Sequence, residues 1–186
     1  MKKLVLALCL TVATLPAFAG DSSYLKLSLW DQIAVSVPLN NQNVTGLDFG
    51  IGSETKHLTG LQFDFIYAHV QREVAGVQWA WIFADAQEVT GWQGALLARA
   101  DRVTGLHSGL VTLNNREVVG VNWGLANMAQ QITGVQLGFV NIAESVSGLQ
   151  FGLVNKTADI RGLQIGLVNL AGNGWFPVMV IVNGRF

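Results

Sequence analysis

The feature that most constrains this chain is a glycine that recurs every 14 to 16 residues. Each of these glycines follows an aliphatic residue two places earlier and precedes an apolar residue in most units. A repeat of this length is too small to bury its own apolar surface, so neighbouring units must pack against one another. Nine units fill residues 44–171, and their glycines are Gly46, Gly60, Gly76, Gly91, Gly105, Gly120, Gly134, Gly148 and Gly162.

The other positions of the unit are also regular when each glycine is numbered as position 0. The later units approach the consensus V-x-G-L-Q-x-G-L-V-N-x-A, with small residues at position +4 and large apolar residues at position +5. The last four units add an asparagine at position +7. Position +2 is polar throughout, and its residues are Asp48, Gln62, Gln78, Gln93, His107, Asn122, Gln136, Gln150 and Gln164.

Apolar and polar residues alternate within each unit, which is typical of a β-strand. One face carries Leu149, Phe151 and Leu153, and the other carries glycines and Gln150. A helix is disfavoured, since each of its glycines would cost about 1 kcal/mol relative to alanine. Polar segments such as residues 114–117 and 156–159 are expected to be turns. The chain is therefore predicted to be all-β.

Two architectures fit this pattern. In a β-solenoid each unit is one coil, the Leu/Phe/Leu face forms the core, and the Gln and Asn positions form hydrogen-bonded ladders. In an outer-membrane up-and-down β-barrel the same apolar face would meet lipid, and the C-terminal Phe186 resembles the end of such barrels. A repeat of one strand rather than a hairpin, short linkers and a short apolar stretch favour the solenoid.

The two ends of the chain depart from the repeat. Residues 1–19 resemble a signal peptide, with Lys2 and Lys3, an apolar run and an Ala-Phe-Ala cleavage pattern before Gly20. A lipoprotein signal at Cys9 is the alternative. Residues 20–186 are predicted to form a single β-repeat domain. Its N-terminal cap is expected at residues 24–40, and a last strand at residues 175–186 follows a turn at Asn173.

Composition excludes several classes of function. Cleavage would leave nine basic and twelve acidic residues, and would remove the only cysteine. This balance offers no basic patch for nucleic acid. The absence of cysteine excludes disulfides, thiolate nucleophiles and cysteine-ligated metals from the mature chain. We expect an exported protein in the outer membrane, at the cell surface or in the periplasm.

The C-terminal units, from ITGVQLGFVNIA to the segment NGWFP, resemble a bacterial family of exported surface repeat-containing proteins with GLQ-x-G-L-V-N repeats. The resemblance covers residues 44–186 and is sharpest from Val118 onward. Earlier units, such as that with Trp79 and Trp81, keep the period and lose the consensus. The family has no established biochemical activity, so the resemblance implies export and an envelope location and assigns no functional residue.

Residues that could carry chemistry are few. His57, His69 and His107 lack metal-ligand spacing, and His107 is expected to be a variant in the Gln ladder. Asp64 and Asp85 are acids near aromatic residues; Asp64 is expected in a groove or on a hydrated face. The segment GLHSG at residues 105–109 places its serine one residue late for a hydrolase elbow. We therefore predict no catalytic, cofactor-binding or metal-binding residue.

Aromatic residues cluster in the early units, where Phe63 and Trp79, and Phe65 and Trp81, are expected to stack. They predict core packing or lipid contact, or a surface that binds glycan or a partner. The expected function is a structural or interaction role in the cell envelope without catalysis, with an outer-membrane pore as the alternative. Expected partners are a protein, a glycan or membrane lipid, and self-association is possible.

Overall fold

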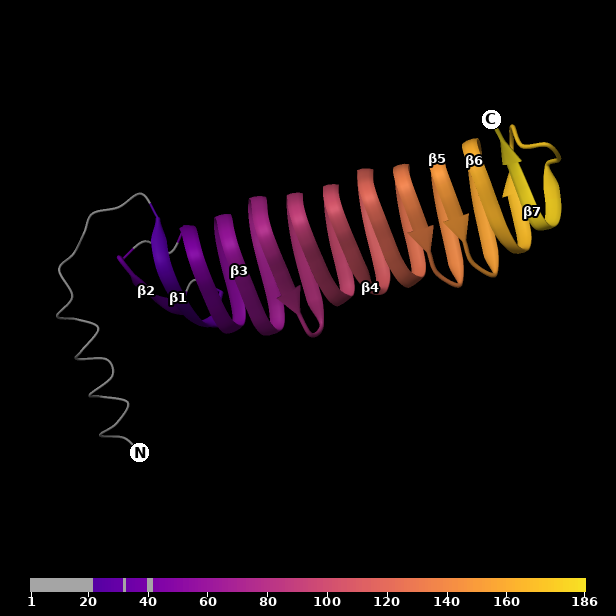
Figure 1. Ribbon diagram of the computed structural model, residues 1–186. Helices are drawn as coiled ribbons and strands as arrows, with labels where there is room; N and C mark the ends of the chain where they lie inside the picture. Colours follow the sequence, from indigo (N-terminus) through magenta and orange to yellow (C-terminus); the bar gives the residue numbers. More distant parts are fainter. Residues whose placement is uncertain (1–21, 32, 40–41) are drawn as a thin grey trace.

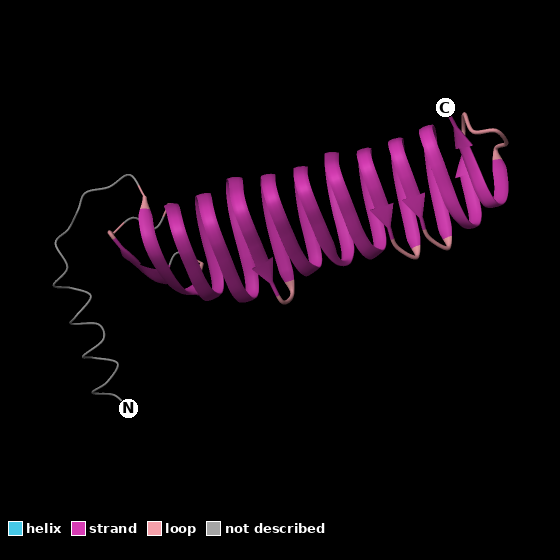
Figure 2. Ribbon diagram, in the orientation of Figure 1, coloured by secondary structure: helices cyan, strands magenta, loops and turns pink. Residues whose placement is uncertain are grey.

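The computed structural model describes residues 22–31, 33–39 and 42–186, so the expected signal peptide lies outside the described residues. The described chain winds into a rod of stacked coils without a helix (Figures 1 and 2). Its single sheet has the order β2-β1-β3-β4-β5-β6-β7. The strands are β1 (Ser23–Trp30), β2 (Ile33–Val37), β3 (Asn43–Ala80), β4 (Phe83–Leu137), β5 (Val140–Phe151), β6 (Val154–Ala171) and β7 (Val178–Arg185).

Successive coils pair in parallel and in register, which confirms the predicted β-solenoid. Gln136 of β4 pairs with Gln150 of β5, and Gln150 pairs with Gln164 of β6. An up-and-down arrangement would have paired these strands antiparallel. Parallel stacking by one repeat places equivalent residues of neighbouring coils in columns along the rod, which explains why each unit repeats the same residue types.

The glycine at position 0 is required by two features of the coil. Gly148 has φ of +139°, a conformation that side chains other than glycine rarely adopt. A Cβ atom at this position would also overlap the carbonyl oxygen of Gly134 in the preceding coil. The same close approach recurs along the whole column. The recurring glycine is therefore explained by the close stacking of the coils and not by a phosphate-binding loop.

The interior of the coil is formed by the polar face, and the expectation of a Leu/Phe/Leu core was wrong. Gln150 and Asn155 are completely buried, together with the aliphatic Val146 and Ile160, whereas Phe151 is 53% exposed. The interior of the coil holds valine, isoleucine, alanine and flat amides, together with Leu58 near its N-terminal end. The leucine and phenylalanine side chains of the Leu/Phe/Leu face point outward.

The buried amides are stabilised by the ladders that the sequence predicted. Gln164 Nε2 donates to Gln150 Oε1, and Gln150 Nε2 donates to Gln136 Oε1, both at 2.8 Å. Asn141 Nδ2 donates to Asn155 Oδ1 at 2.8 Å and to a backbone carbonyl at 2.9 Å. Burying an amide is favourable only when its hydrogen bonds are replaced. From Gln136 to Gln164 each coil supplies these bonds to the next, whereas the buried side-chain amide of Asn122 has no hydrogen-bond partner among the described residues.

The polar segments expected to be turns are part of the strands. Residues 114–117 lie within β4, and residues 156–159 lie within β6. Lys156 pairs with Ile142, and Asp159 pairs with Ser145. Because each coil stacks directly on the previous one, the backbone bends here without leaving the ladder.

Antiparallel strands cap both ends of the rod. At the N-terminal end β1 joins β3 in parallel, and β2 pairs antiparallel with β1. At the C-terminal end β7 pairs antiparallel with β6. The last strand begins at Val178 rather than at Trp175. Residues 172–177 form turns and bends, and Pro177 has no backbone N–H to donate to a ladder.

Candidate functional site

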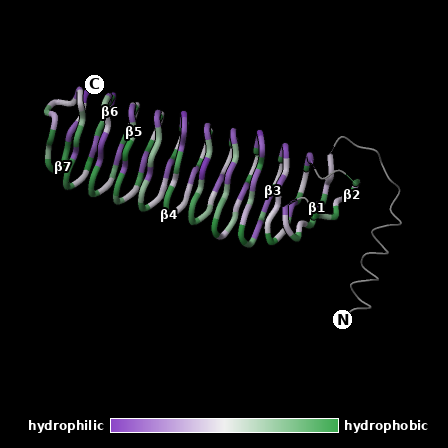
Figure 3. Tube along the Cα trace, turned by 180° about the vertical axis from the view of Figure 1, so that it is seen from behind, coloured by the Kyte–Doolittle hydropathy of each residue, from purple (hydrophilic) through white to green (hydrophobic). Residues whose placement is uncertain are grey.

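The outward positions +1, +3 and +5 form an apolar face along the rod, which Gly94 and Ser108 interrupt at position +3 of two neighbouring coils. In the coil of Gly148 they are Leu149, Phe151 and Leu153. Along the chain trace, hydrophilic residues gather at one long edge of the rod and hydrophobic residues at the other (Figure 3). Contiguous exposed apolar surface of this extent is unusual for a monomeric protein and marks an interaction site.

A groove of about 990 Å³ lies on this face between the +3 and +5 positions. Its walls are large apolar side chains, including Trp123, Leu125 and Phe139. Its floor is the backbone of the small residues at position +4, which are Ala80, Ala95, Gly109, Gly124, Gly138, Gly152 and Gly166.

The glycine floor and the asparagine ladder depend on each other. A Cβ atom on Gly138 would overlap the amide nitrogen of Asn127, and one on Gly152 would lie 2.6 Å from Asn141 Nδ2. The asparagine side chains therefore occupy the space directly beneath the glycines. This explains why the consensus contains both residues. In earlier coils the floor carries Ala80 and Ala95, and position +7 carries Phe83 and Ala98.

The aromatic residues of the early coils lie on or beside this face. Phe63 contacts Trp79, with ring centroids 6.4 Å apart and tilted planes, and Trp79 meets Trp81 edge to face at 5.2 Å. Phe63 also stacks on Phe49 at 5.8 Å. The expected stacking of Phe63 on Trp79 is therefore wrong in its geometry: the two rings meet at a tilt, and Phe63 stacks on Phe49 instead.

The polar edge carries a separate cluster around His69 and Asp85. His69 Nδ1 lies 3.1 Å from Asp85 Oδ2, and Arg99 Nε lies 4.0 Å from Asp85 Oδ1. The adjacent Asp85 carboxylate raises the pKa of His69, and burial opposes the rise. These residues border a polar pocket of about 470 Å³ that also includes Arg72 and Asp101. Sequence reasoning missed this pair, because position +9 holds His69 in one coil and Asp85 in the next.

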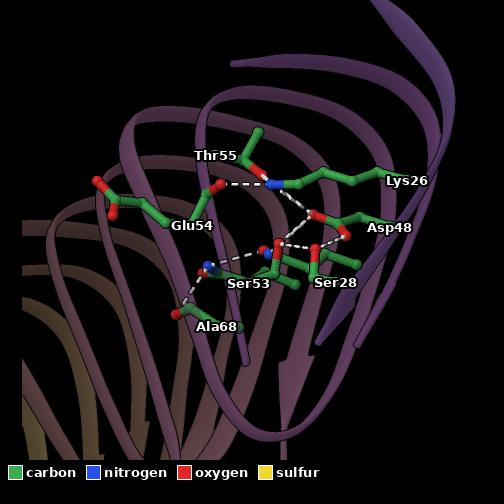
Figure 4. A network of polar contacts seen from close by, with 9 residues as sticks. Lys26, Ser28, Asp48, Ser53, Glu54, Thr55 and Ala68 are labelled. Atoms are coloured by element: carbon green, nitrogen blue, oxygen red, sulfur yellow. Dashed lines mark hydrogen bonds and ion pairs between the residues drawn. The ribbon is translucent and has the colours of Figure 1, made fainter. Parts of the chain in front are cut away.

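A buried polar network closes the N-terminal end of the interior (Figure 4). Lys26 of β1 pairs in register with Asp48 of β3, so it continues the Gln column. Its Nζ lies 3.8 Å from Asp48 Oδ2, donates to Thr55 Oγ1 at 3.0 Å and also donates to the carbonyl of Glu54. Asp48 further accepts a hydrogen bond from Ser53 at 2.6 Å. Desolvation lowers the pKa of Lys26, and neighbouring carboxylates oppose that shift.

Asp64 lies beside this network and is buried, so the expectation of a hydrated face was wrong. Desolvation raises its pKa to about 8, and the charge of Asp48 adds to the rise. Lys26 and, to a smaller extent, Gln62 oppose the rise. No group of the described residues meets hydrogen-bond geometry with either carboxylate oxygen. Asp64 is therefore largely protonated at neutral pH.

The remaining candidates are explained by the coil. His107 is buried in the Gln column as expected; its Nδ1 lies 2.8 Å from Asn114 Nδ2, and desolvation lowers its pKa to about 4. Ser108 accepts a hydrogen bond from Trp92 Nε1 at 2.8 Å. His57, His69 and His107 stand in three different coils. Within the described part of the chain, no three His, Cys, Asp or Glu residues gather as metal ligands.

Comparison of the chain with protein-family models, curated proteins and solved structures found no match. The described residues include no helix long and apolar enough to cross a bilayer. The groove and the apolar face around it are therefore the strongest candidate for a functional site, on the basis of geometry alone.

Proposed function

We propose that this protein is an exported, non-catalytic component of the bacterial envelope that binds a lipid surface through its apolar face. The observation that carries the proposal is the orientation of the coil: the Leu/Phe/Leu positions face outward from one end of the rod to the other. Export and relationship to the surface repeat family belong to the same proposal, and both rest on the sequence.

The distribution of polarity supports a lipid surface over other partners. The exposed charged residues at positions +11 and +12, such as Glu88, Arg102 and Asp159, would remain in water while the apolar face meets lipid. Burying half-exposed leucine and phenylalanine side chains contributes about 1 kcal/mol each, and many act together along the rod. Trp30, Trp81 and Trp123 are also exposed, and tryptophan is enriched where protein meets the membrane interface.

Glycan and protein partners are less well matched to the apolar face. Sugar hydroxyls and peptide groups need hydrogen-bond partners, and the groove is lined by hydrocarbon and aromatic side chains. The rings of Phe49 and Phe63 stack on each other, so the ring faces between them are not open to a sugar. Self-association of two apolar faces is the main competing use of the same surface.

The proposal is tested by fractionation and vesicle flotation. The mature protein should be recovered from the cell envelope and should float with vesicles of phosphatidylethanolamine and phosphatidylglycerol. Leu153→Asp on the apolar face should reduce flotation strongly, whereas Ala158→Asp on the polar edge of the same coil should not.

Equal flotation of the two variants would contradict the proposal, as would recovery of the protein from the cytoplasm. A stable dimer that does not float would assign the face to self-association instead. Stepwise conductance across a planar bilayer would support the pore that the sequence left as the alternative.

A further inference from the structure

The groove has a narrower chemical preference than the apolar face around it. Its lining contains no charged side chain among the described residues. Its one hydroxyl, Ser108, accepts a hydrogen bond from Trp92 and donates to the carbonyl of Gln93 at 3.3 Å. The floor is backbone that already pairs with neighbouring coils, as at Gly138 and Gly152. A ligand in this groove therefore finds hydrocarbon contacts and few free hydrogen-bonding groups.

We propose that the groove binds one acyl chain of a single lipid molecule, which lies lengthwise along the rod between the +3 and +5 side chains. This inference rests on the proposed function and names the ligand of its central surface. A saturated hydrocarbon chain gives up no hydrogen bond when it leaves water, so it is the partner that this uncharged lining matches. A peptide or a sugar would lose hydrogen bonds on entry.

The groove is longer than one extended acyl chain and can hold all of it. Its floor advances by six coils from Ala80 to Gly166, and at about 4.8 Å per coil this is about 29 Å. The hydrocarbon core of a bilayer is about 30 Å thick, so one leaflet, and hence one acyl chain, is about half as long. A whole chain can therefore lie extended in the groove.

The C-terminal end of the groove contains an unusual residue. Ile181 lines the groove and pairs in register with Gly166, the last residue of the floor. Its φ is +70°, a strained conformation for a β-branched residue. Val180 and Ile181 are consecutive in sequence, and both are exposed. Strain of this kind concentrates at ligand-binding sites, and here it places an extra apolar side chain at the mouth of the groove.

Tryptophan fluorescence tests the location of the chain. One variant keeps Trp123, which lines the groove and is 60% exposed; the other keeps Trp175, which is 51% exposed and lies outside the lining. The remaining tryptophans are replaced by phenylalanine. Titration with palmitate brominated in mid-chain should quench Trp123 at about one equivalent and leave Trp175 nearly unchanged. Equal quenching of both, or none, would overturn the proposal.

Two substitutions in one coil test the affinity. Leu125 lines the groove and is 48% exposed, and Met128 lies outside the lining and is 44% exposed. Leu125→Ser should weaken palmitate binding about fivefold to tenfold, because it removes hydrocarbon from the wall. Met128→Ser should leave the affinity unchanged; equal losses would overturn the assignment.

The two proposals fail differently. Vesicle flotation that depends on Leu153, without saturable binding of palmitate, would refute the acyl-chain site and leave surface binding intact. Stoichiometric palmitate binding without flotation would refute surface binding and support the groove as a carrier site. Absence of both would refute both proposals.

Discussion

Because amides are buried and large apolar side chains are exposed, substitutions in one coil should change its stability in an unusual order. Asn141 and Phe139 belong to the same unit; Asn141 is completely buried, whereas Phe139 is 58% exposed. Asn141→Ala removes the bonds to Asn155 Oδ1 and to the carbonyl of Phe151, and the bond accepted from Asn127. Asn155 Oδ1 then loses its donor, while the Phe151 carbonyl keeps the bond from the Gly138 amide.

The expected magnitudes follow from these contacts. Lost bonds and a buried unsatisfied oxygen cost about 3 kcal/mol in Asn141→Ala. Phe139→Ala removes a side chain that is already half in water and should cost about 1 kcal/mol. In an ordinary apolar core the phenylalanine would cost about 3 to 5 kcal/mol, so the order of the two variants distinguishes the two arrangements.

Urea unfolding followed by circular dichroism measures both variants against the parent chain. Because the two positions share one coil, fraying of the ends of the rod affects them alike. A larger loss of stability in Phe139→Ala than in Asn141→Ala would refute the burial of the amide face.

Two further predictions concern the glycine column and the buried acid. Gly148→Ala should prevent folding or lower the urea midpoint of unfolding sharply, because the added Cβ would overlap the Gly134 carbonyl. Gly52→Ala should be tolerated, because its Cβ would meet the Trp30 ring at an ordinary contact distance of 3.4 Å. Equal urea midpoints for the two variants would contradict the stacking of the coils. Asp64 has a native pKa of about 8, raised from 3.8, so the folded state binds its proton more tightly than the unfolded state. Its stabilisation is complete below pH 3.8 and is lost as pH rises toward 8, by about 1.4 kcal/mol per pH unit. Asp64→Asn should remove this loss when unfolding is measured at pH 5 and pH 8, and an unchanged pH dependence would count against the burial of the acid.

Much of the fold follows from the sequence, because each coil needs the same residues at the same positions. The period, the parallel register and both amide ladders were predictable from Gly148, Gln150, Asn155 and their equivalents. Alternation identifies two faces of a strand without telling which one is buried. Ordinary hydrophobicity selects the leucine face for the core, whereas the coil turns this face outward and satisfies the buried amides from neighbouring coils.

The polar clusters were less predictable, since they depend on which coil lies beside which. Lys26 precedes the repeat and lacks its consensus, so nothing in the sequence placed it in the Gln column above Asp48. His69 and Asp85 stand 16 residues apart and meet because their coils stack in register. The groove was hidden for a related reason: its walls could be identified as apolar residues, and only the coil shows that they face outward.

The most direct test of the account is the accessibility of two adjacent residues, Gln150 and Phe151. Each is replaced by cysteine in a chain whose native Cys9 is changed to serine, and its reaction with a small maleimide is followed with and without urea. Phe151→Cys should react in the folded protein at nearly the unfolded rate, because this position is exposed. Gln150→Cys should react only on unfolding, because Gln150 is completely buried. If Gln150→Cys reacted in the folded protein and Phe151→Cys did not, the leucine face would be the buried one. That result would contradict both the exposed apolar face and the groove.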